Sequence, residues 1–261
     1  MAIDQSVLSD ANIEEHYDAK GGDHCSEWTW CHLSGWWRSD MVGIAELVPK
    51  CLTQRELTGL FGNVHHVNGL TMHRNIKRAF EAGQIALIPL PGHWGSSDNL
   101  RLKCIIVDQC IREQPFHTYP GTGLRGVPRE LENCELVFLN GQSPCPQFLY
   151  FRLILTYIHA KRTSNIVFTS SIERKAWAWD YREPQVSIKT LGSLVRKVAD
   201  FELPPCLYPS NADLPNIFLF EHEILKLAKK LRYSLPLNQP AAEPLEVDQS
   251  NEDQEDDYCC L

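Results

Sequence analysis

Alternating hydrophobic and polar positions predict several short strands in this chain. Trp28 and Trp30 alternate with polar neighbours, and Ser34-Gly35 suits a turn directly after them. Compact apolar runs predict further strands at 44–49, 84–89, 103–108, 135–139 and 165–170. The pattern therefore indicates a small sheet packed against helices.

Helical spacing appears in three other segments. Between Thr71 and Ala82 the apolar residues recur every three or four positions, and Gly83 stands where a helix would end in a left-handed conformation. The segment 148–161 is apolar nearly all round, which predicts a buried helix, and 217–231 has one apolar face. These helices, combined with the strands, predict an α+β fold.

Charge is distributed unevenly along the 261 residues. Eight of the 33 acidic residues follow Arg232, beyond which there is no Lys or Arg, so the remaining 25 acidic residues balance the 25 basic ones. A neutral body gives no broad attraction for a phosphate backbone, and an acidic tail would repel one. Charge therefore does not favour nucleic acid as a partner, which would need a local basic patch; a protein or small-molecule partner stays open.

The sequence predicts an intracellular protein, cytoplasmic or nuclear, with no membrane association. No apolar run approaches the length of about 18 residues that a membrane span needs. The acidic residues Asp4, Asp10, Glu14 and Glu15 are unlike the start of a secretory signal. The 10 cysteines include no Cys-x-x-Cys pair, so we expect reduced thiols rather than a disulfide framework.

The stretch from Ile44 to Gly83 carries a family resemblance. Ala45-Glu46-Leu47-Val48-Pro49 is followed by Asn68-Gly69-Leu70 and then by Phe80-Glu81-Ala82-Gly83. This order resembles the metal-binding core of HNH (His-Asn-His) nucleases, whose members tend to read Ala-His-(Ile/Leu)-Val-Pro, Asn-Gly-Leu, a histidine, and Phe-(Asp/Glu)-x-Gly. The resemblance extends from Cys31 to Lys161, and its downstream part is similar to proteins of filamentous fungi that carry this domain.

The resemblance implies a ββα-metal core with a divalent cation between a hairpin and a helix. In the family, a histidine ending the first strand takes a proton from water, an asparagine orients that histidine, and a helix histidine binds the metal. Here the asparagine is Asn68, but Glu46 stands at the base position and Lys77 at the helix position. A charged lysine has three donors and no acceptor, so Lys77 would repel a divalent metal.

Three histidines are candidates to replace the missing ligands. His73 precedes Lys77 by four residues and would share its helical face, and His65 and His66 precede Asn68. If the site is active, Glu46 and Asn68 would be catalytic, the three histidines would bind Mg²⁺, Mn²⁺ or Zn²⁺, and the chain would be a phosphodiester hydrolase. A histidine pair beside Asn-Gly is more often a solvated turn, in which case the protein needs no cofactor.

Three functional hypotheses are consistent with these residues. The favoured one is an HNH-like protein with a degenerate site that serves as a binding or accessory protein. The alternatives are an active metal-dependent endonuclease with a rearranged site, and an enzyme or accessory protein of a fungal specialised-metabolite pathway. We divide the chain into a loosely attached polar lead-in (1–24), the HNH-like domain (25–161), an α/β extension packed on it (162–234) and a disordered acidic tail (235–261).

Overall fold

The computed structural model of the protein describes residues 10–22, 26–62, 67–90, 100–115, 117–118, 125–174, 188–208 and 219–234. Within these ranges the fold is mixed α+β. The predictions for the tail at 235–261 and for the start of the helix at 217–218 lie outside the described residues.

The described strands form four antiparallel pairs. β1 (Trp28–Cys31) pairs with β2 (Gly35–Arg38), and β3 (Val42–Ala45) pairs with β4 (Leu70–His73). β5 (Ile85–Pro89) pairs with β6 (Leu102–Ile106), and β7 (His117–Thr118) pairs with β8 (Arg125–Gly126). The hairpin predicted around Trp28 and Trp30 and the strands predicted at 84–89 and 103–108 are confirmed.

Two helices accompany the β3–β4 pair. α2 (Gln54–Phe61) lies in the connection between the strands and begins at Thr53, whose side chain forms a capping box with Glu56. α3 (Arg74–Glu81) follows β4 without a loop and packs against β3 and β4. The elements therefore follow one another in the order β3, α2, β4 and α3, with β3 and β4 paired and α3 packed on both.

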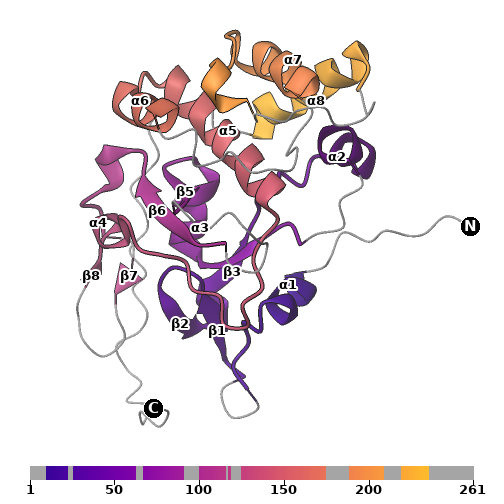
Figure 1. Ribbon diagram of the computed structural model, residues 1–261. Coiled ribbons are helices and arrows are strands. Elements are labelled where there is room, and N and C mark those ends of the chain that lie inside the picture. Colours follow the sequence, from indigo (N-terminus) through magenta and orange to yellow (C-terminus); the bar gives the residue numbers. More distant parts are fainter. Residues whose placement is uncertain are drawn as a thin grey trace, which may run out of the picture.

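A helical layer covers one end of the molecule (Figure 1). α5 (Pro146–Arg162) extends between this layer and the strands. Around the end of α5 that is farther from the strands lie α6 (Ile166–Arg174), α7 (Ile188–Ala199) and α8 (Glu221–Ser234). The short α4 (Pro128–Leu131) packs beside β6. Three 3₁₀ turns, at Ser39–Met41, Gln109–Ile111 and Pro205–Leu207, complete the described elements. No described helix has both the length and the apolar character that crossing a membrane requires.

Four predicted elements differ from the structure. The strand expected at 44–49 is β3, which spans Val42–Ala45 and ends before Glu46. Residues 71–73, which we expected at the start of a helix, belong to β4 because they pair with β3, and α3 begins only at Arg74. The strand expected at 165–170 is the start of α6. The strand expected at 135–139 contributes a single bridge, between Lys103 and Glu135.

The N-terminal segment is packed rather than loosely attached in the part that the structure describes. α1 (Asp10–His16) contacts β4, and Ile13 and Tyr17 are both buried. The Lys20 backbone also bridges to Thr29 of β1. The polar composition of 1–24 concealed these two apolar anchors, which are enough to hold the segment on the core.

Candidate functional site

Asn68 lies just before β4 and binds the backbone of Val48, three residues after the end of β3. Its Nδ2 donates to the Val48 carbonyl at 2.7 Å, and its Oδ1 accepts from the Val48 backbone N–H at 2.7 Å. The family role suggested that Asn68 would orient the side chain at position 46. In this structure the amide instead fixes the backbone two residues after Glu46, and so holds the loop that carries it.

Gly69 is required by the close approach of its neighbours. A Cβ atom on Gly69 would lie 2.5 Å from Cγ2 of Ile44 and 3.1 Å from Cδ1 of Ile13. Real Cβ atoms do not approach other carbons so closely, and glycine is the residue that permits such contact. The Asn68-Gly69 pair therefore serves the packing of the hairpin against α1.

Glu46 follows β3 directly and is held by Lys50. Its Oε2 accepts from the Lys50 backbone N–H at 2.9 Å, and its Oε1 lies 3.1 Å from Lys50 Nζ. The Glu46 backbone N–H donates to Oε1 of Glu81 at 3.4 Å. Both carboxylate oxygens of Glu46 thus have partners within the chain, and the helix α3 reaches the same place through Glu81.

The Lys77 side chain extends from α3 and lies against β3. Its Cδ is 3.4 Å from the position that a Cβ on Gly43 would take, so the aliphatic part of the lysine covers the bare backbone of that glycine. Its Nζ is 3.9 Å from Oε1 of Glu81, the outer limit of an ion pair. Lys77 lies beside Gly43, and Glu81 lies beside Glu46. The chain therefore runs in the same direction in α3 as in β3.

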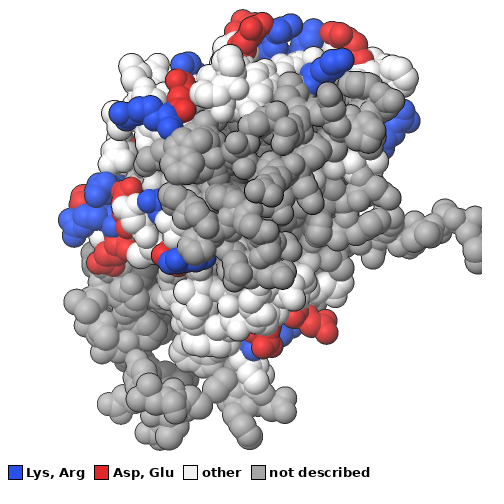
Figure 2. All heavy atoms as spheres, in the orientation of Figure 1, with Lys and Arg blue, Asp and Glu red and all other residues white. Residues whose placement is uncertain are grey.

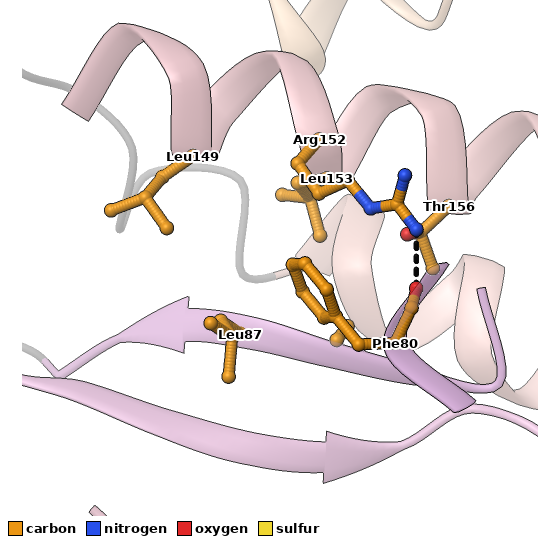
Figure 3. Close-up of a pocket in the computed structure, with 7 residues that line it drawn as sticks. Phe80, Leu87, Leu149, Arg152, Leu153 and Thr156 are labelled. Carbon is orange, nitrogen blue, oxygen red and sulfur yellow. Dashed lines mark hydrogen bonds between the residues drawn. The ribbon is translucent and has the colours of Figure 1, made fainter. Parts of the chain in front are cut away.

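Arg152 brings a further positive charge from α5. Its guanidinium donates to the Phe80 carbonyl at the end of α3 and lies 4.7 Å from the centroid of the Phe80 ring (Figure 3). Burial lowers the pKa of Arg152 to about 10, and the charges of Glu81 and Glu46 oppose this shift. The adjoining hollow, lined by Phe80, Leu87 and Thr156 among others, is too narrow for a water molecule.

Glu81 stands between these cations. Burial raises the pKa of its carboxyl, and the neighbouring Glu46 charge adds to this; Lys77, the Glu46 backbone N–H and Arg152 act in the opposite direction. The raised pKa shows that burial outweighs the nearby positive charges. Glu81 is therefore protonated at a higher pH than an ordinary, solvent-exposed glutamate.

His73 does not join this group. It is the last residue of β4 and the N-cap of α3, is fully buried, and accepts a hydrogen bond at Nδ1 from Asn75 N–H. Its ring centroid lies 4.7 Å from that of Trp37. His73 pairs with Val42, four positions before Glu46, a separation of about 13 Å along a strand. The prediction that His73 shares a helical face with Lys77 is wrong, because α3 starts after it.

The other predicted histidines, His65 and His66, lie outside the described residues. Within the described ranges, no three His, Cys, Asp or Glu side chains gather as a set of metal ligands. Of the acidic groups at the hairpin and helix, Glu46 and Glu81 are the two that could contribute oxygens to a cation, and each already faces a lysine.

Sequence reasoning did not single out Lys50, Glu81 or Arg152. The first two carried a signal, because Lys50 follows Glu46 by four residues and Glu81 follows Lys77 by four, the spacing of neighbours on one turn. Arg152 stands out as a charge within an otherwise apolar helical run, and a buried charge requires a specific partner.

Comparison with family models, curated proteins and solved structures finds no match to this chain.

Proposed function

We propose that this chain is a degenerate ββα-metal protein of HNH-like type, which uses the hairpin and helix as a scaffold and acts as a binding or accessory protein. Metal-dependent phosphodiester hydrolysis is lost. The observation that carries the proposal is Lys77, because the side chain at the helix-ligand position is an ammonium group directed at Glu81. A protonated amine has no lone pair for a metal.

The scaffold half of the proposal rests on the order and contacts of the elements. β3 ends before Glu46, β4 starts two residues after Asn68, and α3 follows immediately and packs on β3. Asn68, two residues before β4, is hydrogen-bonded to the backbone of Val48, three residues after the end of β3. This order of elements, with Asn68 just before β4, supports the proposed scaffold.

The loss of hydrolysis rests on what the base and ligand positions now hold. Glu46 presents a carboxylate in place of imidazole, and its two oxygens are engaged by Lys50. As a class, carboxylates are weaker bases at neutral pH than imidazole. The alternative, a rearranged nuclease site of Glu46, Asn68 and His73, is disfavoured because His73 is about 13 Å away along the hairpin.

Surface charge bears on the kind of partner. On the face seen in Figure 2, basic and acidic side chains lie close together rather than forming a field of one sign. Among the described residues, ion pairs include Arg112 with Glu132 at 2.9 Å and Arg101 with Glu135 at 2.5 Å. A mixed surface of this kind attracts a polyanion weakly, which favours a protein or small-molecule partner over nucleic acid.

The test is a cleavage assay on the full chain. Plasmid DNA and RNA are incubated with the purified protein and Mg²⁺, Mn²⁺ or Zn²⁺ in turn, beside the variants Asn68→Ala and Glu46→Gln. We expect no cleavage by the wild type above the level of either variant. Cleavage by the wild type that Glu46→Gln abolishes would overturn the proposal, and this second variant settles the question even if Asn68→Ala does not fold.

A further inference from the structure

The β1–β2 hairpin has one edge in use and one open edge. On the β1 side, Trp30 N–H donates to the Ala19 carbonyl at 2.7 Å, and the Trp28 carbonyl accepts from Gly21 N–H at 2.8 Å. Among the described residues, no backbone hydrogen bond joins β2 to any strand other than β1. β2 is therefore an edge strand of the described fold, at the end of the molecule away from α6, α7 and α8 (Figure 1).

The open edge of β2 presents two backbone donors and two backbone acceptors. In an antiparallel pair, a residue directs its N–H and its C=O to the same side, and so does the residue opposite it. Trp28 and Trp30 bond to the segment before β1, so their partners Arg38 and Trp36 direct these groups away from β1. The two outward residues lie symmetrically on either side of Trp37. Natural edges are often protected by a proline or a bulge, and β2 has neither.

The side chains beside this edge form an aromatic and cationic surface. Trp36 and Arg38 share one face of the hairpin, on which Trp36 is 43% exposed, whereas Trp37 faces the core. The Trp30 ring meets that of Trp36 at 5.4 Å with an interplanar angle of 72°, and Trp30 Nε1 donates to the Val137 carbonyl at 2.9 Å. The exposed indole of Trp36 is thus supported by a neighbour that is itself fixed, which lowers the entropy lost when a partner binds.

We infer that the open edge of β2 pairs with the same edge of a second copy of this chain, antiparallel, about a twofold axis at Trp37. In this register Trp36 exchanges two backbone hydrogen bonds with the partner's Arg38, and Arg38 exchanges two with the partner's Trp36. All four outward groups are then satisfied, in a continuous sheet of the order β1-β2-β2-β1. This interface is independent of the proposed function.

The side chains explain why a second copy is the occupant. Directly opposite residues of paired strands lie side by side on one face, so each Arg38 guanidinium reaches the ring of the partner's Trp36. An arginine over an indole is a favourable cation–π contact, and the twofold axis makes it twice. Arg38 lies 3.3 Å from Asp40, but both side chains are 65% exposed, and such a pair is weak enough to rearrange. A strand with tryptophan and arginine at these two positions is complementary to itself.

The experiment is sedimentation equilibrium of the full chain over a range of concentrations, with the wild type, Trp36→Thr and Trp28→Thr compared. Trp28 is the matched control, because it lies on the same face with 38% exposure but on β1, away from the open edge. We expect the wild type to dimerise reversibly. Trp36→Thr loses both cation–π contacts and should dimerise about tenfold more weakly, whereas Trp28→Thr should match the wild type.

Two further variants test the register, because they change the charge that faces Arg38 across the axis. Trp36→Glu places a carboxylate opposite the partner's Arg38, and Trp36→Lys places a second cation there. We expect Trp36→Glu to dimerise more tightly than Trp36→Lys, by about tenfold at low salt and by less at high salt. Equal dimerisation of the two variants would refute this register. Both substitutions are at an exposed position, and circular dichroism verifies that the variants fold.

The inference fails if the wild type remains a monomer at millimolar concentration, or if Trp28→Thr weakens association as much as Trp36→Thr. Hydrogen exchange distinguishes the other possible occupants. In the dimer the N–H groups of Trp36 and Arg38 should exchange slowly, and dilution should make them exchange fast. A monomer with slow exchange at these groups would show that another segment of the same chain covers the edge. A monomer with fast exchange would leave the edge open to an extended segment of a different protein, and either result overturns the inference.

Discussion

The two sides of the β3–β4 hairpin are held by different kinds of interaction. On the hydrogen-bonded side, formed by Asn68, Gly69, Thr71 and His32, the contacts are short: the half-buried Asn68 makes two bonds of 2.7 Å to Val48, and in the core His32 Nδ1 lies 2.8 Å from Thr71 Oγ1. On the charged side, formed by Glu46, Lys50, Lys77 and Glu81, the ion pairs are 3.1 and 3.9 Å long and partly exposed.

This difference separates the groups that build the hairpin from those that would do chemistry. Buried hydrogen bonds are costly to leave unmade, whereas exposed ion pairs contribute little to stability. Substitutions on the charged side are therefore tolerated by the fold, and Glu46 and Lys77, the positions on which the proposed function depends, both lie there. The scaffold does not depend on the residues that its chemistry would need.

The largest effect is expected for Asn68→Ala. It leaves the N–H and the carbonyl of the fully buried Val48 without their side-chain partner, which costs about 3–4 kcal/mol of unfolding free energy. Urea unfolding measures the loss. Asn140→Ala is the matched control, because Asn140 also donates to a backbone carbonyl, that of His16, at 2.7 Å but is exposed. Equal losses in the two variants would contradict the comparison.

A slightly smaller loss of unfolding free energy is expected when the pH is lowered, because of His32. Burial lowers the pKa of its imidazole to about 4, with the Thr71 backbone contact acting in the opposite direction. The folded state therefore binds a proton less readily than the unfolded chain. Stability present above the unfolded pKa of about 6.5 is lost as the pH falls towards 4, by about 3 kcal/mol in total.

The measurement is the free energy of unfolding between pH 7 and pH 4 in the wild type and in His32→Phe. The variant is less stable at pH 7, because the contact with Thr71 is lost, but its stability should fall less steeply with acid. Carboxyl groups such as Glu81 titrate in both proteins, so the difference between the two curves isolates His32. Parallel curves would show that His32 does not titrate on unfolding.

Local sequence patterns correctly predicted those elements whose structure depends mainly on residues nearby in the sequence. The turn at Ser34-Gly35 and the helix stop at Gly83, which has a φ of +74°, are of this kind. At 165–170 the β-branched content favoured a strand, but Asn165 accepts from Phe168 N–H and donates to the Val107 carbonyl, which fixes the first turn of α6. The contact with Val107 is not visible in the local pattern.

The candidate site was predictable in part for the same reason. The motif named Glu46, Asn68 and Lys77; Glu46 and Lys77 both contact Glu81, whereas Asn68 binds Val48. The role of His73 did not follow from the motif, because helical spacing continues from Met72 into α3 although β4 pairs with β3 up to His73. Arg152 reaches Phe80 across 72 positions of sequence, and such a contact depends on the packing of α5.

Gly69→Ala should destabilise the protein by about 2 kcal/mol, because the new methyl group overlaps Cγ2 of Ile44 at 2.5 Å and the core must shift to receive it. Gly22→Ala is the control, since a Cβ on Gly22 would meet nothing within 4 Å. Thermal unfolding of the two variants measures the difference. A Gly69→Ala protein as stable as Gly22→Ala would show that Ile44 does not pack as closely on Gly69 as the structure indicates.

The smallest effect is expected on the charged side, for Lys50→Met. The Lys50 side chain is 58% exposed, and the Lys50 backbone N–H still donates to Glu46 Oε2 when the ammonium is gone. Loss of an exposed pair of this kind costs about 0.5 kcal/mol or less, and added salt should reduce even that. Urea unfolding at low and high salt measures both quantities. A loss as large as that of Asn68→Ala would mean that the charged side also holds the hairpin, and the division between scaffold and chemistry would no longer stand.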